Sequence, residues 1–175
     1  MREQDVEKVR EVVTRSSEET IALGREFSQQ LRPPVLVCLD GELGAGKTTL
    51  AKGIISGLGA AREEDVTSPT FTFVHVFRKD TAPAEERSFA SLRMTGNAVT
   101  ARHTSLKVFH VDLYRVADRH DLETLGLEDL FAEPGIVLVE WPDRLKLRTD
   151  WPVVRIELEH GEGETRRIRV EELKS

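Results

Sequence analysis

The chain has 175 residues, of which 39% are apolar and 32% are charged, and its formal net charge is −6. This length and composition favour one globular domain with a substantial core. The negative charge argues against a broad basic surface that binds nucleic acid directly, so we expect any nucleic-acid role to pass through a partner. The charged N-terminus and the absence of a long apolar stretch predict a cytoplasmic protein that does not enter a membrane.

The N-terminal region is predicted to form two helices. Residues 3–13 are predicted as a short polar helix. A longer helix is expected to begin at Ser16-Ser17, followed by two glutamates in its first turn, and to end before Pro33. Its apolar stripe consists of Ile21, Leu23, Phe27 and Leu31.

Residues 35–49 contain the most informative pattern in the chain. The apolar run at 35–39 predicts a strand, the segment after residue 47 predicts a helix ending near Gly57 or Gly59, and G-x-x-x-x-G-K-T lies between them. Glycines in this loop let successive backbone N–H groups point toward a phosphate. The N-terminus of the following helix adds a positive dipole. The pattern therefore predicts a nucleoside triphosphate site.

The side chains of this loop have separate expected roles. Lys47 is expected to reach the β- and γ-phosphates and to assist catalysis, and the Thr48 hydroxyl is expected to bind Mg²⁺. The predicted cofactors are therefore ATP and Mg²⁺. The predicted nucleotide-binding residues are Gly41, Glu42, Leu43, Gly44, Ala45, Gly46, Lys47, Thr48, Thr49, Thr70 and Trp141.

The remaining elements predict an α/β P-loop NTPase fold, a three-layer sandwich with a mostly parallel sheet and an antiparallel edge hairpin. Residues 78–105 lack periodicity and are predicted to be a flexible insertion or an extended hairpin within a single domain spanning 1–175. The predicted strands are 71–77, 106–112, 136–139, 153–158 and 166–170, with a short helix at 121–131.

Two acids follow apolar strands, where the carboxyl ends of a parallel sheet form the ligand crevice. Glu140 follows the fully apolar run 136–139, so we assign it to Mg²⁺ together with Thr48. Asp112 is expected to support the metal's ligands from outside the coordination shell or to orient the attacking water, and the roles of Asp112 and Glu140 could be exchanged. The predicted catalytic residues are Asp112, Glu140 and Lys47.

For most of the neighbouring residues, the sequence allows two alternative roles. The segment 67–70 is either a switch that senses the γ-phosphate or an ordinary hydroxyl-rich turn. Trp141 either covers a ligand or anchors the core. His110 points away from its neighbours on the strand and is assigned a structural role, whereas Tyr114 and Arg115 either contact nucleotide or partner or lie in a solvated loop.

Adenine is the expected base because the only asparagine, Asn97, lies in the insertion and no N-K-x-D element is available for guanine. A partner-dependent ATPase is the main hypothesis. The alternatives are a small-molecule kinase, in which Arg115 and Arg119 clamp the transferred phosphoryl group, and a nucleotide-gated interaction module without hydrolysis.

The chain resembles the TsaE family of small P-loop ATPases in bacterial tRNA threonylcarbamoyladenosine biosynthesis. The matching segments are S-S-E-E-T-x-x-L-G (16–24), G-E-L-G-A-G-K-T-T (41–49), S-P-T-F (68–71), H-V-D-L-Y-R (110–115) and V-E-W-P (139–142). The resemblance implies slow ATP hydrolysis, Mg²⁺ at Thr48 and Glu140, a role for Asp112 in hydrolysis, and enclosure of adenine near 17–20. It also implies action through TsaD and TsaB on adenosine 37 of tRNA, with tRNA contacted only indirectly.

The insertion departs from this family pattern, in which a short turn connects the two strands. Its basic residues outnumber its acidic ones, which suggests either an added contact with partner or tRNA or a tolerated solvated segment. The basic residues are Arg78, Lys79, Arg87, Arg93 and Arg102.

Overall fold

The computed structural model describes residues 6–80, 105–116, 127–144 and 149–173. These residues form one seven-stranded sheet with two α-helices and three short 3-10 helices. The elements are β1 (Val6–Thr14), α1 (Ser17–Ser28), β2 (Val35–Asp40), α2 (Lys47–Gly57), η1 (Glu63–Asp65), β3 (Val74–Asp80), β4 (Ser105–Asp112), η2 (Leu127–Phe131), β5 (Ile136–Glu140), η3 (Pro142–Arg144), β6 (Val153–His160) and β7 (Arg166–Leu173).

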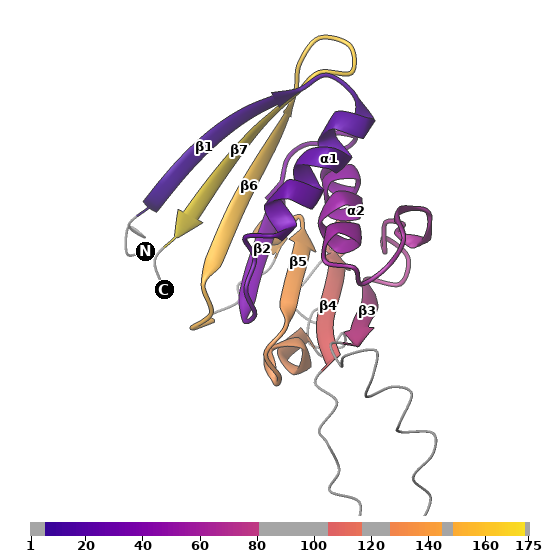
Figure 1. Cartoon of the computed structure of the whole chain (residues 1–175), viewed down its shortest axis with the longest axis vertical. Coiled ribbons are helices and arrows are strands. Elements are labelled where there is room, and N and C mark those ends of the chain that lie inside the picture. Colours follow the sequence, from indigo (N-terminus) through magenta and orange to yellow (C-terminus); the bar gives the residue numbers. More distant parts are fainter. Residues whose placement is uncertain (1–5, 81–104, 117–126, 145–148, 174–175) are drawn as a thin grey trace, which may run out of the picture.

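The strand order is β1-β7-β6-β2-β5-β4-β3. The four central strands, β6, β2, β5 and β4, run parallel, whereas β1, β7 and β3 pair antiparallel at the two flanks. Figure 1 shows this sheet with α1 and α2 in front of one face. The predicted mixed α/β sandwich is confirmed, including the hairpin formed by β6 and β7.

Both faces of the central strands are buried, which explains why β2 and β5 are almost continuously apolar. On one face, side chains from α1 and α2 pack with residues such as Val37, Leu39 and Leu138 in the main core. On the other face, a second cluster is closed by residues such as Phe131 and Trp151. The carboxyl ends of β2, β5 and β4 consequently meet at one edge of the sheet.

The two helices cross at a pair of glycines. A Cβ on Gly53 would lie 2.2 Å from the Ile21 carbonyl oxygen, and a Cβ on Gly24 would lie 2.6 Å from the Leu50 carbonyl oxygen. The helix backbones therefore touch, and α1 fixes the position of α2. The predicted start of α1 is confirmed, because the Ser16 side chain accepts a hydrogen bond from the Glu19 amide at 3.1 Å.

The prediction of a helix at residues 3–13 was wrong, because residues 6–14 form strand β1. The valines recur at spacings of three and four residues, which imitates a helical stripe. The free edge of β7 decides the outcome, and β1 pairs with it from Val6↔Leu173 to Thr14↔Arg166. Valine also has a high preference for strands, so the sheet edge and the residue type agree.

Two other boundaries differ from the prediction. The strand predicted at 71–77 begins only at Val74, because Phe73 has a left-handed backbone with φ of 62° and ends a turn. Of the helix predicted at 121–131, residues 121–126 lie outside the described residues, and Leu127–Phe131 is a 3-10 helix.

The β3–β4 ladder continues to Asp80↔Ser105, so residues 78–80 and 105 belong to strands. The remainder of the predicted insertion, residues 81–104, lies outside the described residues. Within the part of the chain that is described, no helix is both long and apolar enough to span a membrane.

Candidate nucleotide site

The loop between β2 and α2 has the backbone that a phosphate cradle requires. Gly41, Gly44 and Gly46 have φ values of 143°, 79° and 101°, which side-chain-bearing residues rarely adopt. A Cβ on Gly41 would also lie 2.3 Å from the Leu158 carbonyl oxygen. Helix α2 begins immediately afterwards at Lys47, and its N-cap, Gly46, has no side chain to cap it. The first amides of α2 are therefore directed toward the loop.

Lys47 is folded into this loop and is only 4% exposed. Its Nζ donates to the carbonyl oxygens of Gly41 at 2.7 Å and Glu42 at 2.8 Å. The same ammonium lies 3.9 Å from the centroid of the Trp141 ring. Burial lowers the pKa of Lys47, while three carboxylates (Glu140, Asp112 and Asp40) act in the opposite direction.

Thr48 and Glu140 are joined directly, although they lie 92 positions apart in the sequence. The Thr48 Oγ1 donates to Glu140 Oε1 at 2.8 Å, and Glu140 is 3% exposed at the end of β5. A hydroxyl and one carboxylate beside a phosphate cradle form the kind of protein ligand set that Mg²⁺ uses when phosphates supply further oxygens. These two residues therefore fit a magnesium ion that is shared with a nucleotide.

Asp112 is held by a different set of donors. Its Oδ2 accepts hydrogen bonds from the hydroxyls of Ser68 at 2.7 Å and Thr70 at 2.5 Å, and its Oδ1 accepts from the Tyr114 amide at 2.9 Å. The Asp112 side chain is buried, with 2% exposure. Ser68 and Thr70, predicted to lie in a switch or an ordinary turn, thus connect their loop to an acid at the edge of the site.

Aromatic residues surround this edge. Trp141 has a left-handed backbone with φ of 62°, and its ring lies 5.1 Å from the Tyr114 ring. The Arg115 guanidinium lies 4.2 Å from the centroid of the Phe71 ring. Phe71 is 78% exposed, and Leu43, in the phosphate loop, is 70% exposed. Large apolar side chains therefore project around the candidate site.

The comparisons with known proteins agree with these features. The family model "Threonylcarbamoyl adenosine biosynthesis protein TsaE" matches residues 14–89 and 95–168. The chain belongs to the TsaE family. The matched residues include the phosphate loop and both acids at the carboxyl edge of the sheet, and they extend through β6 into the start of β7.

Individual TsaE-family relatives support the same assignment. The tRNA threonylcarbamoyladenosine biosynthesis protein TsaE of Aquifex aeolicus is 31% identical over 94% of this chain and 98% of its own length. The corresponding protein of Haemophilus influenzae is 33% identical over 71% of this chain and 65% of its own length. The crystal structure of YdiB from Bacillus subtilis superposes with a TM-score of 0.64 and 25% identity, covering 97% of this chain and 88% of that one.

The structure of this TsaE-family chain brings most of the predicted site residues together. The phosphate loop from Gly41 to Thr49, with Asp112, Glu140 and Trp141, lies at the carboxyl edge of the parallel strands, and Thr70 reaches it through Asp112. Arg119, which the kinase alternative requires, lies outside the described residues. In the segment expected near adenine, the Thr20 hydroxyl is buried against the Thr14 hydroxyl at 2.8 Å.

Three residues near the site were not predicted to belong to it. His110 contacts Glu140, with 2.8 Å between Nε2 and Oε1. His160 and Arg166, at the two ends of the β6–β7 turn, lie beside Gly44 and Gly46. The alternation in H-x-D, which places His110 and Asp112 on one face of β4, is the only sequence signal that indicates the first contact. The positions of His160 and Arg166 depend on how the β6–β7 hairpin packs against the phosphate loop.

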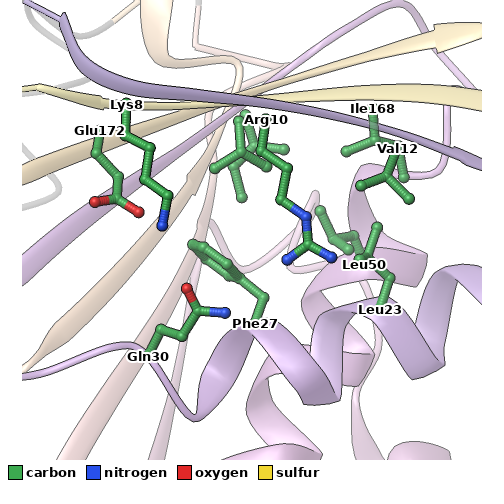
Figure 2. A pocket seen from close by; sticks show the side chains of 11 residues that line it. Lys8, Arg10, Val12, Leu23, Phe27, Gln30, Leu50, Ile168 and Glu172 are labelled. Atoms are coloured by element: carbon green, nitrogen blue, oxygen red, sulfur yellow. The ribbon is translucent and has the colours of Figure 1, made fainter.

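A separate pocket lies between α1 and the strands β1, β6 and β7 (Figure 2). Figure 2 shows an apolar interior that includes Phe27 and Leu23, with Lys8, Arg10 and Glu172 around it. The pocket contains neither the phosphate loop nor the two acids, so its chemistry does not fit a triphosphate. The loop between β2 and α2 therefore remains the candidate site for a nucleotide.

Proposed function

We propose that this chain binds and hydrolyses ATP with Mg²⁺ and that this activity is required to form the threonylcarbamoyl group on adenosine 37 of tRNA. The single observation that carries the proposal is the Thr48–Glu140 hydrogen bond at the mouth of a glycine cradle. Membership of a family described as threonylcarbamoyl adenosine biosynthesis proteins supplies the biological setting. We further expect the protein to act in the cytoplasm.

In this proposal the amides of the phosphate loop and the first turn of α2 bind the phosphate oxygens. Lys47 leaves its two carbonyl partners, and its ammonium binds the β- and γ-phosphates. Thr48 and Glu140 hold Mg²⁺, which supplies positive charge to the phosphate oxygens when it is bound. Adenine remains the expected base.

Asp112 is proposed to orient the attacking water and to accept its proton as the water oxygen bonds to the γ-phosphorus. The bond from that phosphorus to the bridging oxygen breaks in the same step, and ADP leaves with that oxygen. The two hydroxyl donors of Asp112, Ser68 and Thr70, lie on a loop that leads directly into β3. Movement of this loop would change both the position and the hydrogen bonds of Asp112. Hydrolysis is therefore expected to depend on the conformation of residues 67–73.

We propose TsaD and TsaB as the partners that select this conformation, with tRNA reached only through them. The exposed apolar side chains of Leu43 and Phe71, together with the half-buried Trp141 and the more exposed Tyr114, support a protein-binding surface near the site. The net charge of −6 supports contact with a protein rather than directly with the phosphates of tRNA.

The decisive experiment measures phosphate release with purified TsaD, TsaB and tRNA, each added and omitted in turn. Stimulation by the TsaD–TsaB pair is expected. ADP formation only in the presence of a small-molecule acceptor would favour the kinase alternative. Binding of ATP without phosphate release under any of these conditions would instead identify a nucleotide-gated interaction module.

A further inference from the structure

Glu140 has a second donor besides Thr48. His110 Nε2 lies 2.8 Å from Glu140 Oε1, the same oxygen that accepts the Thr48 hydroxyl. Because both contacts go to Oε1, neither engages Oε2. The carboxylate is thus held at one oxygen from two directions, by a helix residue and by a neighbouring strand.

The burial of His110 gives this contact its significance. His110 is 0% exposed. It lies on the same face of β4 as Val108, a residue of the main core. Among the described residues, its second ring nitrogen, Nδ1, has no hydrogen-bond partner. An apolar residue at position 110 would pack in the core without leaving a nitrogen unpaired. What histidine adds at this position is therefore its contact with Glu140.

We propose that His110 is a positioning residue that orients Glu140 for Mg²⁺. The ring holds Oε1 through Nε2–H and so directs the carboxylate toward the mouth of the phosphate loop. This inference rests on the proposed function, because it assumes that Glu140 binds the metal. Residues that hydrogen-bond to a metal ligand commonly change metal affinity by roughly 10- to 100-fold when they are replaced.

The test uses four variants of the full chain. His110→Leu removes the N–H donor. His110→Asn keeps an N–H group, but on a shorter side chain that no longer reaches Glu140. His110→Gln keeps an N–H at a similar distance from the backbone. The matched control is His75→Leu, because His75 pairs with His110 in the β3–β4 ladder on the side away from β5.

The measurement is binding of fluorescent mant-ADP at increasing Mg²⁺ concentrations and in EDTA, with thermal denaturation of each variant. For His110→Leu and His110→Asn, the Mg²⁺ concentration at half effect should rise roughly tenfold or more, while binding in EDTA stays unchanged. His110→Gln and His75→Leu should follow the wild type. Thermal stability alone does not explain that pattern, because a loss of packing would not be rescued by glutamine and would not act only through Mg²⁺.

Two results would overturn the proposal. One is a wild-type Mg²⁺ curve for both His110→Leu and His110→Asn, and the other is a defect of the same size in His110→Gln. If the wild-type protein binds mant-ADP with no Mg²⁺ dependence, the proposed function fails at Glu140 and the inference fails with it. A normal wild-type Mg²⁺ dependence combined with either of the first two results rejects only the role of His110.

Discussion

The two acids of the candidate site are supported in different ways. Glu140 is held by Thr48 and His110, which lie on a core helix and a central strand. Asp112 is held on its Oδ2 by Ser68 and Thr70, which lie on the loop before β3. Both carboxylates are almost completely buried, yet only the second depends on a segment outside the regular elements.

We infer that this difference separates the binding of Mg²⁺ from the control of hydrolysis within the candidate site. A metal ligand supported by packed elements is ready before nucleotide arrives, which fits the general requirement that charged groups be preorganised. An acid supported by a loop can be released or tightened when that loop contacts a partner. We therefore expect Mg²⁺ binding to be a property of the chain alone and hydrolysis to respond to the partners.

The largest expected effect comes from replacing each acid by its amide. Both Glu140→Gln and Asp112→Asn should lower the rate of ATP hydrolysis by roughly 10²- to 10³-fold, since each removes a charge that acts on the reacting groups. Only Glu140→Gln should also weaken the effect of Mg²⁺ on nucleotide binding. Phosphate release and mant-ADP titrations measure the two properties separately.

The proposed difference between the two acids is wrong if Mg²⁺ no longer strengthens nucleotide binding in either variant, because both acids would then bind the metal. If both hydrolyse ATP at the wild-type rate, neither acid is catalytic and the site assignment is wrong.

The next effect concerns the phosphates themselves. Lys47→Ala should weaken nucleotide binding by about 10- to 100-fold, because a buried charge-assisted contact contributes on the order of 1.5–3 kcal/mol. The loss should appear with and without Mg²⁺, unlike the loss in Glu140→Gln. Calorimetric titration with ADP measures it, and Lys52→Ala, further along the same helix, is the control. Equal affinities for Lys47→Ala and the wild type would remove the phosphate loop from the binding site.

A smaller effect should follow when the hydrogen bonds between the loop before β3 and Asp112 are removed. Ser68→Ala combined with Thr70→Val removes both hydroxyls from Asp112 Oδ2. We expect turnover to fall roughly tenfold, equivalent to about 1.4 kcal/mol of transition-state stabilisation, because Asp112 keeps its bond from the Tyr114 amide. Nucleotide affinity should be unchanged. The control is Thr72→Val, because the Thr72 hydroxyl has only a 3.5 Å contact with the Pro69 carbonyl oxygen. Unchanged stimulation of the double variant by TsaD and TsaB would show that the loop does not carry their effect.

The smallest effect tests how firmly the central sheet is packed. Burial raises the pKa of Cys38 to about 11, so at pH 8 the native thiol should not react with a disulfide reagent. Because the thiol is harder to ionise in the folded protein, the free energy of unfolding is unaffected by Cys38 below its unfolded-state pKa of about 9. It falls as the pH rises from there toward 11. A colourimetric thiol assay with and without denaturant checks the first point, and rapid native labelling would indicate that β2 opens.

Much of the site was predictable because its chemistry is local. The glycine spacing before Lys47 requires particular backbone angles and is recognisable in a short window. Glu140 and Asp112 were identified because an acid directly after an apolar strand lies at a predictable edge of a parallel sheet. The same reasoning predicted the central strands, since residues buried on both faces form continuous apolar runs.

Strand β1 and one contact of the candidate site show where distant residues decide the outcome. The prediction of a polar helix over residues 3–13 was wrong, because pairing with β7 and the strand preference of valine favour strand β1. The contact between His110 and Glu140 was not predicted, because the sequence does not indicate which side chain of β5 lies beside His110. The contact with Glu140 spans 30 positions.

The sequence alone therefore indicated the family, the phosphate loop and the two acids of the candidate site, because each motif that carries them can be recognised within a few residues. Only the tertiary structure decided which donors each acid receives, that Lys47 lies against Trp141, and that the hairpin from β6 to β7 borders the loop. These features depend on strand order and register, which arise from the packing of the whole sheet rather than from any local pattern.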